Sequence, residues 1–182
     1  MSWKTFKEAK LAAYSKAKEK GEVDVLIVAL VEKINMNPDL VSLSSCSGRI
    51  NLLRFDIDER KSTAEFFAKW HEPVDKEEFE MKLYSYMEKM QLWFKVEPFI
   101  LHIAAKDVQS AGRFLEKIRK MGVKRGGIQT IAKEKVLMEV QGNDTIAVPA
   151  DSVEEWGSLI DTANRMMKRN QDVLKKLEKL EW

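Results

Sequence analysis

LVSLSSCSGRINLLRFDI, residues 40–57, holds two apolar runs on either side of a turn rich in serine and glycine. Short runs of valine, leucine and isoleucine that are bounded by small turn residues are typical of β-strands. The pattern therefore predicts strands over residues 40–46 and 49–57, joined by a short turn at Ser47-Gly48.

Helical patterns lie on both sides of these strands. After Asp24, a residue type that often begins helices, apolar residues recur from Ile27 to Ile34 at helical spacing. The same reasoning predicts the remaining helices over residues 4–20, 63–70, 75–90, 107–121 and about 152–181. The remaining strands are predicted over 93–105, with an interruption at Pro98, and over 127–132, 136–141 and 145–148.

In this order of elements, groups of strands are separated by pairs of helices. It favours an α+β fold, with a largely antiparallel sheet packed with helices, over a doubly wound Rossmann-like sheet. The sequence also lacks the glycine-rich dinucleotide and P-loop motifs. We expect a single α+β domain over residues 1–182. Small-residue turns lead into strands at Ser47-Gly48-Arg49 and at Arg125-Gly126-Gly127, which suggests two similar halves.

The composition narrows the class of protein. The chain has 182 residues, of which 45% are hydrophobic and 33% charged, so wholesale disorder is excluded. Its longest apolar run, Val25–Val31, is far shorter than the roughly 18 residues of a membrane span. The N-terminus has no secretory signal pattern, and we expect a cytoplasmic protein. With Cys46 as the single cysteine, we expect no intrachain disulfide and no metal site.

Charge is unevenly distributed along the chain, although the net charge is only +2. Residues 106–135 contain nine basic and three acidic residues, and residues 4–20 contain six lysines and two glutamates. Such segregation can present a positive surface to phosphates. The alternative is that these lysines lie on exposed helix faces and only keep the protein soluble.

The turn at residues 42–49 is the most unusual stretch. Four serines, Cys46, Gly48 and Arg49 meet where one predicted strand ends and the next begins. Hydroxyls, backbone N–H groups and a guanidinium at such a turn can bind a phosphate or a carboxylate. The alternative is a tight turn whose small residues let a helix pack closely.

Two histidines are further candidates. His71 follows Trp70 at the end of a predicted helix, and His102 lies five residues after Glu97 in the stretch broken by Pro98. A histidine on a strand is often a hydrogen-bonded structural residue. If the fold gathers both histidines with Glu97 and Arg49, they would instead form a titratable cluster suited to catalysis.

The stretch Ser44-Ser45-Cys46-Ser47-Gly48-Arg49-Ile50 resembles the signature of the tRNA wybutosine-synthesis methyltransferases, the third enzyme of that pathway. The resemblance extends over nearly the whole chain. It includes Trp70-His71, Lys95 and the run from Glu97 to His102. It departs from the family at Leu43-Ser44 and at Arg125, and the short length resembles the archaeal form.

The resemblance implies an enzyme that transfers a methyl group from S-adenosylmethionine to N-4 of 7-aminocarboxypropyl-demethylwyosine, next to the anticodon of tRNA-Phe. It implies a proton acceptor, His102 or His71. Residues implied to hold the donor or the substrate's aminocarboxypropyl group are Ser45, Ser47, Gly48, Arg49 and Glu97. Residues implied to contact the tRNA are Ser44, Cys46, Trp70 (or Trp93 as the stacking residue), Lys95, Asn164, Arg113, Lys117, Lys120, Lys124 and Arg125.

Two alternatives stay open at this point. The chain could be a tRNA- or RNA-binding module without catalytic activity, which would bind RNA but not the donor. It could also be an interaction protein that dimerises through its long C-terminal helix, and the sequence leaves monomer and dimer equally open.

Overall fold

The computed structural model describes residues 2–55, 64–87 and 90–182. The chain divides into two units, each built on its own four-stranded antiparallel sheet. Unit one contains the described residues up to Ser47 together with Phe99–Asn143 and Gln171–Trp182. Unit two contains Gly48–Pro98 and Asp144–Asn170. This confirms the predicted α+β class with antiparallel pairing, with the strands arranged in two sheets.

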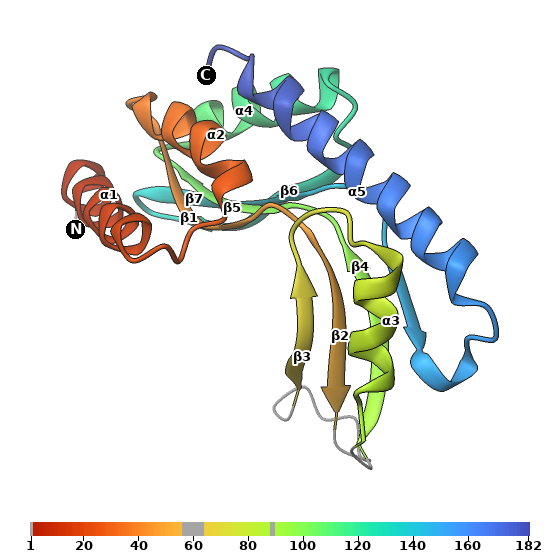
Figure 1. The fold of residues 1–182 in the computed structure, drawn as a ribbon. Helices are drawn as coiled ribbons and strands as arrows, with labels where there is room; N and C mark the ends of the chain where they lie inside the picture. Colours follow the sequence, from red (N-terminus) through yellow and green to blue (C-terminus); the bar gives the residue numbers. More distant parts are fainter. Residues whose placement is uncertain (1, 56–63, 88–89) are drawn as a thin grey trace. The chain divides into compact units, whose positions relative to one another are not determined.

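Unit one has the strand order β1-β5-β7-β6. Figure 1 labels its strands and helices. Its elements are α1 (Trp3–Glu19), α2 (Val25–Met36), β1 (Leu40–Cys46), β5 (Ile100–Ala105), α4 (Val108–Lys120), β6 (Arg125–Ala132), β7 (Lys135–Gln141) and the last turns of α5 (Trp156–Glu178).

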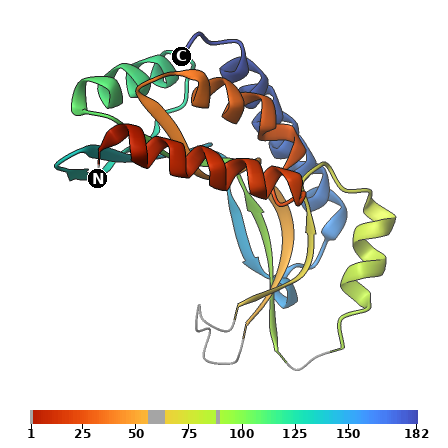
Figure 2. The same cartoon turned by 90° about the vertical axis from the view of Figure 1, so that its left-hand side faces the viewer.

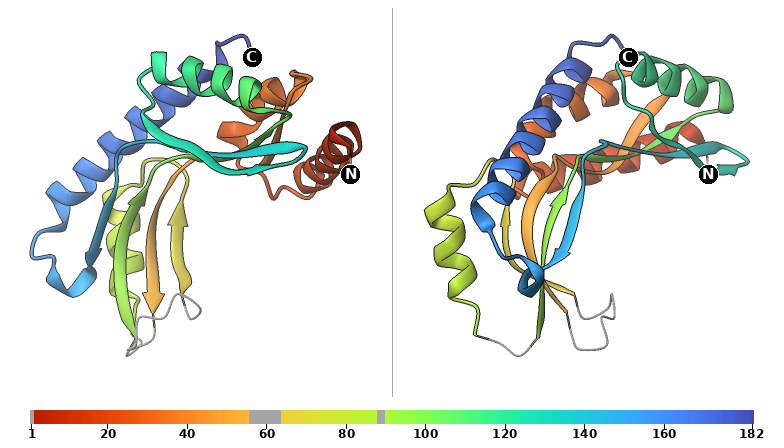
Figure 3. Two further views of the ribbon diagram at one scale, coloured as in Figure 1. Left: turned by 180° about the vertical axis from the view of Figure 1, so that it is seen from behind. Right: turned by 90° about the vertical axis from the view of Figure 1, so that its right-hand side faces the viewer.

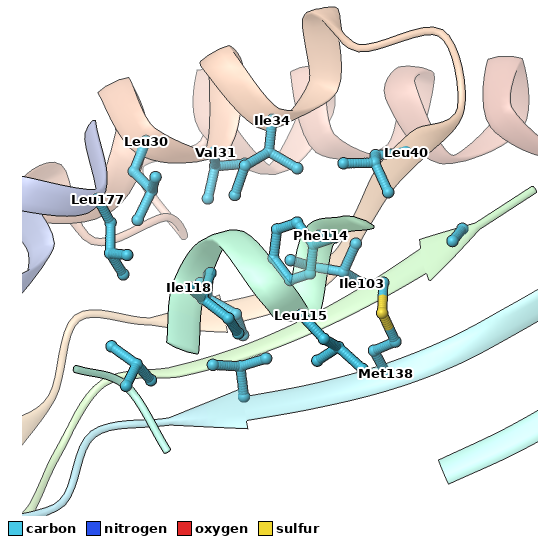
Figure 4. Packing of buried hydrophobic residues seen from close by; sticks show 14 of the residues in the cluster. Leu30, Val31, Ile34, Leu40, Ile103, Phe114, Leu115, Ile118, Met138 and Leu177 are labelled. Carbon is cyan, nitrogen blue, oxygen red and sulfur yellow. The ribbon is translucent and has the colours of Figure 1, made fainter. Parts of the chain in front are cut away.

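The core of unit one lies between one face of this sheet and the helices α2 and α4 (Figure 4). The apolar stripe that includes Leu30 and Ile34 packs with Phe114 of α4 and with alternate strand residues such as Ile103 and Met138. Each side chain buried in this way stabilises the fold by about 1.5–3 kcal/mol. Because side chains alternate along a strand, His102 and Glu139 lie on the opposite face of the sheet.

The helix α1 flanks β1 (Figure 2). Its first turn is fixed by the indole of Trp3, whose Nε1 donates to the carbonyl of Pro38 at 3.0 Å, and by a hydrogen bond from Lys7 to the carbonyl of Asn37. The lysine-rich side of α1 is exposed, as its amphipathic pattern predicts.

Unit two has the strand order β3-β2-β4-β8. Its elements are β2 (Arg49–Phe55), β3 (Glu65–Trp70), α3 (Lys76–Tyr84), β4 (Gln91–Glu97), β8 (Ile146–Pro149), a 3-10 turn (Ala150–Ser152) and the first turns of α5. Its core combines aliphatic residues with aromatic pairs: Phe79 and Phe94 meet edge to face at 5.5 Å, and Trp156 contacts both rings. Such pairs add about 0.5–1.5 kcal/mol each to the stability gained by burial.

The structure corrects four predictions of local structure. Residues 65–70 form the strand β3 and not a helix, because their backbone pairs with β2. The strands β1 and β2 belong to different sheets and do not pair across the serine-glycine turn. The helix α3 ends at Tyr84, before Met87 and Met90.

The fourth correction concerns the start of α5. Ser152 lies in the 3-10 turn, and the helix is capped instead by Glu155, whose carboxylate accepts from the backbone N–H groups of Gly157 and Ser158. The other predicted helices and strands are present with small shifts at their ends. The hairpin of β6 and β7, for example, spans its predicted residues (Figure 3, left).

Among the described residues, no helix combines the length and the apolar character that crossing a bilayer requires.

Candidate functional site

The serine-rich motif of residues 44–50 contributes to both units, because the chain passes from unit one to unit two between Ser47 and Gly48. Gly48 has a φ of +94°, a backbone conformation that side chains with a Cβ rarely adopt. The glycine therefore allows the chain to leave β1 and start β2 in a different sheet.

In unit one, the end of the motif is fixed by Asp24. Its Oδ2 accepts from the backbone N–H of Ser47 at 2.8 Å and from the Ser47 hydroxyl at 3.2 Å. Ser47 itself is fully buried. Asp24 stands at the start of α2 as predicted, but its side chain makes no capping hydrogen bond to that helix. Its carboxylate instead ties the start of α2 to the end of β1.

On the face of the same sheet that is opposite the core, Ser44, His102 and Glu139 form a hydrogen-bonded row. The Ser44 hydroxyl lies 2.8 Å from Nδ1 of His102, and Nε2 of His102 lies 3.0 Å from Oε2 of Glu139. The three residues are direct partners across β1, β5 and β7. A hydroxyl, an imidazole and a carboxylate in this order can accept and hold a proton.

Beside Ser44, a hollow of about 330 Å³ separates α1 from β1. Lys10, Tyr14 and Ser45 are among the residues that line it. Burial, with a smaller contribution from Glu32, raises the pKa of the Tyr14 phenol, which therefore remains protonated at neutral pH. Cys46 follows on β1 and is half-buried.

In unit two, Arg49, Glu97 and Asn51 form a charged cluster. Nε of Arg49 and Nδ2 of Asn51 both donate to Oε2 of Glu97, at 2.7 Å and 3.2 Å. The guanidinium also lies over the ring of Phe66, 4.7 Å from its centroid. Oδ1 of Asn51 is buried and has no hydrogen-bond partner within residues 2–55, 64–87 and 90–182. Lys95 is the cross-strand partner of Asn51.

The other predicted residues of unit two are held by their neighbours. Nδ1 of His71 lies 3.0 Å from the carbonyl oxygen of Gly48, which can only accept, so Nδ1 carries a hydrogen and donates it. Trp70 packs on Phe79 in the core and donates from Nε1 to Glu78. The amide of Asn164 makes two hydrogen bonds of 2.8 Å with the backbone of Val74.

Trp93 has a different environment from Trp70. It alternates with Lys95 and Glu97 on β4, so the three side chains share the face of the sheet on which Arg49 lies. Trp93 is half-buried, and its Nε1 has no partner among the described residues.

The predicted basic residues after position 106 all belong to unit one. Lys117 and Lys120 lie on α4, which packs on the core face of the sheet, whereas the Ser44–His102–Glu139 row lies on the opposite face. Arg113 donates to Ser110, and Lys124 is exposed just beyond α4. Arg125 starts β6 and is the cross-strand partner of Gln141, two residues along β7 from Glu139.

Sequence reasoning had missed Glu139, Asp24 and Asn51 as site residues. Glu139 could have been noticed as the one acidic residue in the otherwise apolar run Val136-Leu137-Met138-Glu139-Val140. The partners of Asp24 and Asn51 depend on strand register, which has no local signal.

The chain has two antiparallel sheets, one with the hydroxyl–imidazole–carboxylate row and the other with the Arg–Glu–Asn cluster. This arrangement defines a class of α+β proteins without a Rossmann sheet. The same fold is found in the solved structure of PH1069 protein from Pyrococcus horikoshii. That structure has a TM-score of 0.90 and 30% identity and covers 97% of this chain and 94% of its own. A hypothetical protein from Aeropyrum pernix is also similar, with a TM-score of 0.71 and 28% identity over 86% of this chain and 95% of that one.

The family model described as Methyltransferase TYW3 matches residues 3–180, so the chain belongs to this methyltransferase family. Among its relatives are proteins named tRNA(Phe) 7-((3-amino-3-carboxypropyl)-4-demethylwyosine(37)-N(4))-methyltransferase. The one from Archaeoglobus fulgidus is 33% identical over 99% of this chain and 90% of its own length. The one from Thermococcus sibiricus is 31% identical over 94% and 90%. The resemblance inferred from the serine-cysteine-arginine motif is confirmed.

Proposed function

We propose that the chain transfers a methyl group from S-adenosylmethionine to N-4 of 7-aminocarboxypropyl-demethylwyosine in tRNA-Phe. Membership of the methyltransferase family and the names of its relatives support this proposal. The observation that carries it furthest is the intact motif of residues 44–50, because its residues contribute to both polar clusters. With tRNA as its substrate, we propose that the enzyme works in the cytoplasm.

The cluster of unit two fits the amino-acid end of S-adenosylmethionine. Arg49 carries a planar fork of N–H donors that suits a carboxylate, and its Nε donates to Glu97. The Glu97 carboxylate and the unpartnered Oδ1 of Asn51 are acceptors that suit an ammonium group. The aminocarboxypropyl group of the substrate has the same two charged groups, so the cluster fits either one.

When bound, S-adenosylmethionine supplies an electrophilic methyl group on a sulfonium. The enzyme must then hold N-4 of the base in line with this methyl group, and such positioning can lower a barrier by about 7–11 kcal/mol. Trp93 offers an aromatic surface on the Arg49 face of the sheet, where the tricyclic base can stack. We assign the tRNA-stacking role to Trp93 because Trp70 packs into the core.

N-4 also loses a proton, and we assign its acceptance to His102. The row places the basic Nδ1 of His102 against the exposed hydroxyl of Ser44. His71 is the second candidate, as the other histidine of the chain, and its Nδ1 is hydrogen-bonded to the Gly48 carbonyl.

For tRNA, we propose contacts on the face of unit one that carries the row. Lys10 lines the hollow beside Ser44, and Arg125 starts the strand β6. The lysines on α4 lie on the other side of this sheet, and they would meet phosphates only if the tRNA extends around the unit.

The test is calorimetric titration of S-adenosylmethionine into wild type and Arg49→Ala, without and with tRNA-Phe that carries the demethylated base. Hydrogen bonds to a charged group are each worth about 1.5–3 kcal/mol, so the variant should bind about 10- to 100-fold more weakly. Arg54→Ala is the matched control, because Arg54 lies on the same strand and pairs with the exposed Glu65.

If Arg49→Ala binds S-adenosylmethionine as tightly as wild type does, the donor does not bind at this cluster. Absence of donor binding in wild type, even with the modified tRNA present, would refute the methyltransferase and favour an RNA-binding module.

A further inference from the structure

One residue from each strand of the unit one sheet forms a continuous line across it: Ser44 on β1, His102 on β5, Glu139 on β7 and Gly127 on β6. Direct cross-strand partners project their side chains from the same face of a sheet. Glu139 therefore contacts the His102 ring at Nε2, on the side away from Ser44. The Glu139 side chain is 28% exposed.

The chemistry of the two hydrogen bonds fixes the tautomer of His102. An ionised carboxylate can only accept, so Nε2 of His102 must carry a hydrogen and donate it to Glu139. In the neutral ring, Nδ1 then has the lone pair, and the Ser44 hydroxyl donates to it. The basic nitrogen, Nδ1, therefore points to the Ser44 hydroxyl and not to the Glu139 carboxylate.

The glycines at the start of β6 leave room around Glu139. A Cβ on Gly126 would lie 2.4 Å from the backbone oxygen of Glu139, and the residue has a φ of +137°, so only glycine fits where β6 approaches β7. Gly127 pairs directly with Glu139, and a Cβ there would meet nothing within 4 Å. The carboxylate therefore has a side-chain neighbour in His102 and open space on the β6 side.

We infer that Glu139 is the positioning residue for proton removal in the proposed reaction, on which this inference rests. As the N4–carbon bond forms and the sulfur–carbon bond breaks, N-4 gives its proton to the oxygen of Ser44, which gives its own proton to Nδ1 of His102. The products are the methylated base, S-adenosylhomocysteine and a protonated His102. Glu139 holds the ring in the accepting tautomer and stabilises the positive charge that forms on it.

The test compares Glu139→Gln with wild type by two independent measurements. Nitrogen-15 NMR of labelled histidine reports which ring nitrogen carries the hydrogen, and assignment is simple because the chain has two histidines. Single-turnover methylation at saturating donor and tRNA reports the chemical step. Glutamine keeps the size of the side chain but can donate as well as accept, so it no longer imposes one tautomer.

In wild type we expect the Nε2–H tautomer of His102. In Glu139→Gln we expect a mixture of tautomers, a single-turnover rate lower by about 10- to 100-fold, and donor and tRNA affinities within about twofold of wild type. Glu139→Asp, which keeps the charge, should recover part of the rate. Glu116→Gln is the matched control, because Glu116 is an exposed α4 residue paired with Lys120.

An unchanged tautomer in Glu139→Gln would overturn the inference whatever the rate does. A changed tautomer with an unchanged rate would also overturn it, and would remove His102 from the reaction. If the wild type transfers no methyl group at all, the proposed function fails, while the NMR measurement still decides whether Glu139 sets the tautomer. Thermal unfolding of each variant identifies one that does not fold, in which case Glu139→Asp carries the comparison.

Discussion

Unit one and unit two have the same plan, a four-stranded antiparallel sheet whose core lies between one face and packed helices, but their polar residues differ in kind. Unit one carries a row of a hydroxyl, an imidazole and a carboxylate that can pass a proton along hydrogen bonds. Unit two carries a guanidinium, a carboxylate and an amide, which suit a charged amino-acid group. One short motif can therefore supply two different chemistries, since Ser44 and Arg49 lie five residues apart in sequence.

Replacement of the histidines should give the largest effect and separate the two units. His102→Gln should lower the single-turnover rate by about 100-fold or more and leave the affinity for S-adenosylmethionine unchanged, because general base catalysis contributes about 10²–10⁴-fold. Rapid-quench methylation beside calorimetry measures both quantities. A larger rate loss in His71→Gln than in His102→Gln would move proton acceptance to unit two and contradict this division.

Asn164→Ala should weaken unit two without changing its chemistry. The substitution leaves the N–H and the carbonyl of the buried Val74 without partners, and each such loss costs about 1–3 kcal/mol. Urea denaturation should show a free energy of unfolding lower by about 2–6 kcal/mol. Thr162→Ala on the same helix is the control, because that hydroxyl is exposed and bonds only within α5.

If Asn164→Ala kept its stability but bound tRNA more weakly, the sequence-based assignment of Asn164 to the substrate pocket would hold instead.

Asp107→Ala should lower the free energy of unfolding of unit one by about 1 kcal/mol, less than the effect of Asn164→Ala on unit two. A loss of this size is typical of a removed helix N-cap. Oδ1 of Asp107 accepts from the backbone N–H of Ser110 at 2.8 Å, and this bond, with the Ser110 hydroxyl, lowers the pKa of the carboxyl from 3.8. A carboxyl whose pKa is lowered by folding stabilises the folded state at pH values above its pKa in the unfolded chain. This contribution to the free energy of unfolding is lost as the pH falls.

The deficit of Asp107→Ala relative to wild type should therefore be constant near neutral pH and shrink as pH drops below about 3.8. Denaturation at a series of pH values measures it. Asp107→Asn keeps a capping group that does not titrate, so its stability should lack this pH-dependent contribution. A deficit in Asp107→Ala that grows in acid would contradict the assignment.

The smallest expected effect distinguishes the two faces of unit one. Lys10→Ala should lower the salt slope of tRNA binding by about one, whereas Lys120→Ala, on the other side of the sheet, should not change it. Filter binding over a range of salt concentrations provides the slopes. The opposite pattern would place the tRNA against α4, as the family resemblance implies for Lys117 and Lys120.

Much of the fold follows from local sequence, because helix caps, apolar periodicity and turn residues act over a few positions. The strand β3 was missed because Phe66, Phe67 and Trp70 also fit a helical spacing, and pairing with β2 decides between the two. The turn at residues 42–49 was found from its composition. Its division between two sheets was not, since nothing local shows that β1 and β2 pair with different partners.

The site residues show the same limit. Ser44, His102 and Glu139 are separated by 58 and 37 positions, and only the registers of two strand pairs bring them together. Asn164 and Trp70 were expected to contact the tRNA because of the family resemblance. Their hydrogen bonds to Val74 and Glu78 depend on tertiary packing, which residue type does not reveal.

The most direct test of the division between the units is the single-turnover methylation rate of Ser44→Ala beside Arg49→Ala, measured on tRNA-Phe at rising S-adenosylmethionine concentrations. We predict that Ser44→Ala lowers the plateau rate by about 10-fold and leaves the half-saturating donor concentration unchanged. Arg49→Ala should instead raise the half-saturating concentration by about 10- to 100-fold. If both variants change the same quantity, the motif serves a single task, and the account of two chemically distinct clusters is wrong.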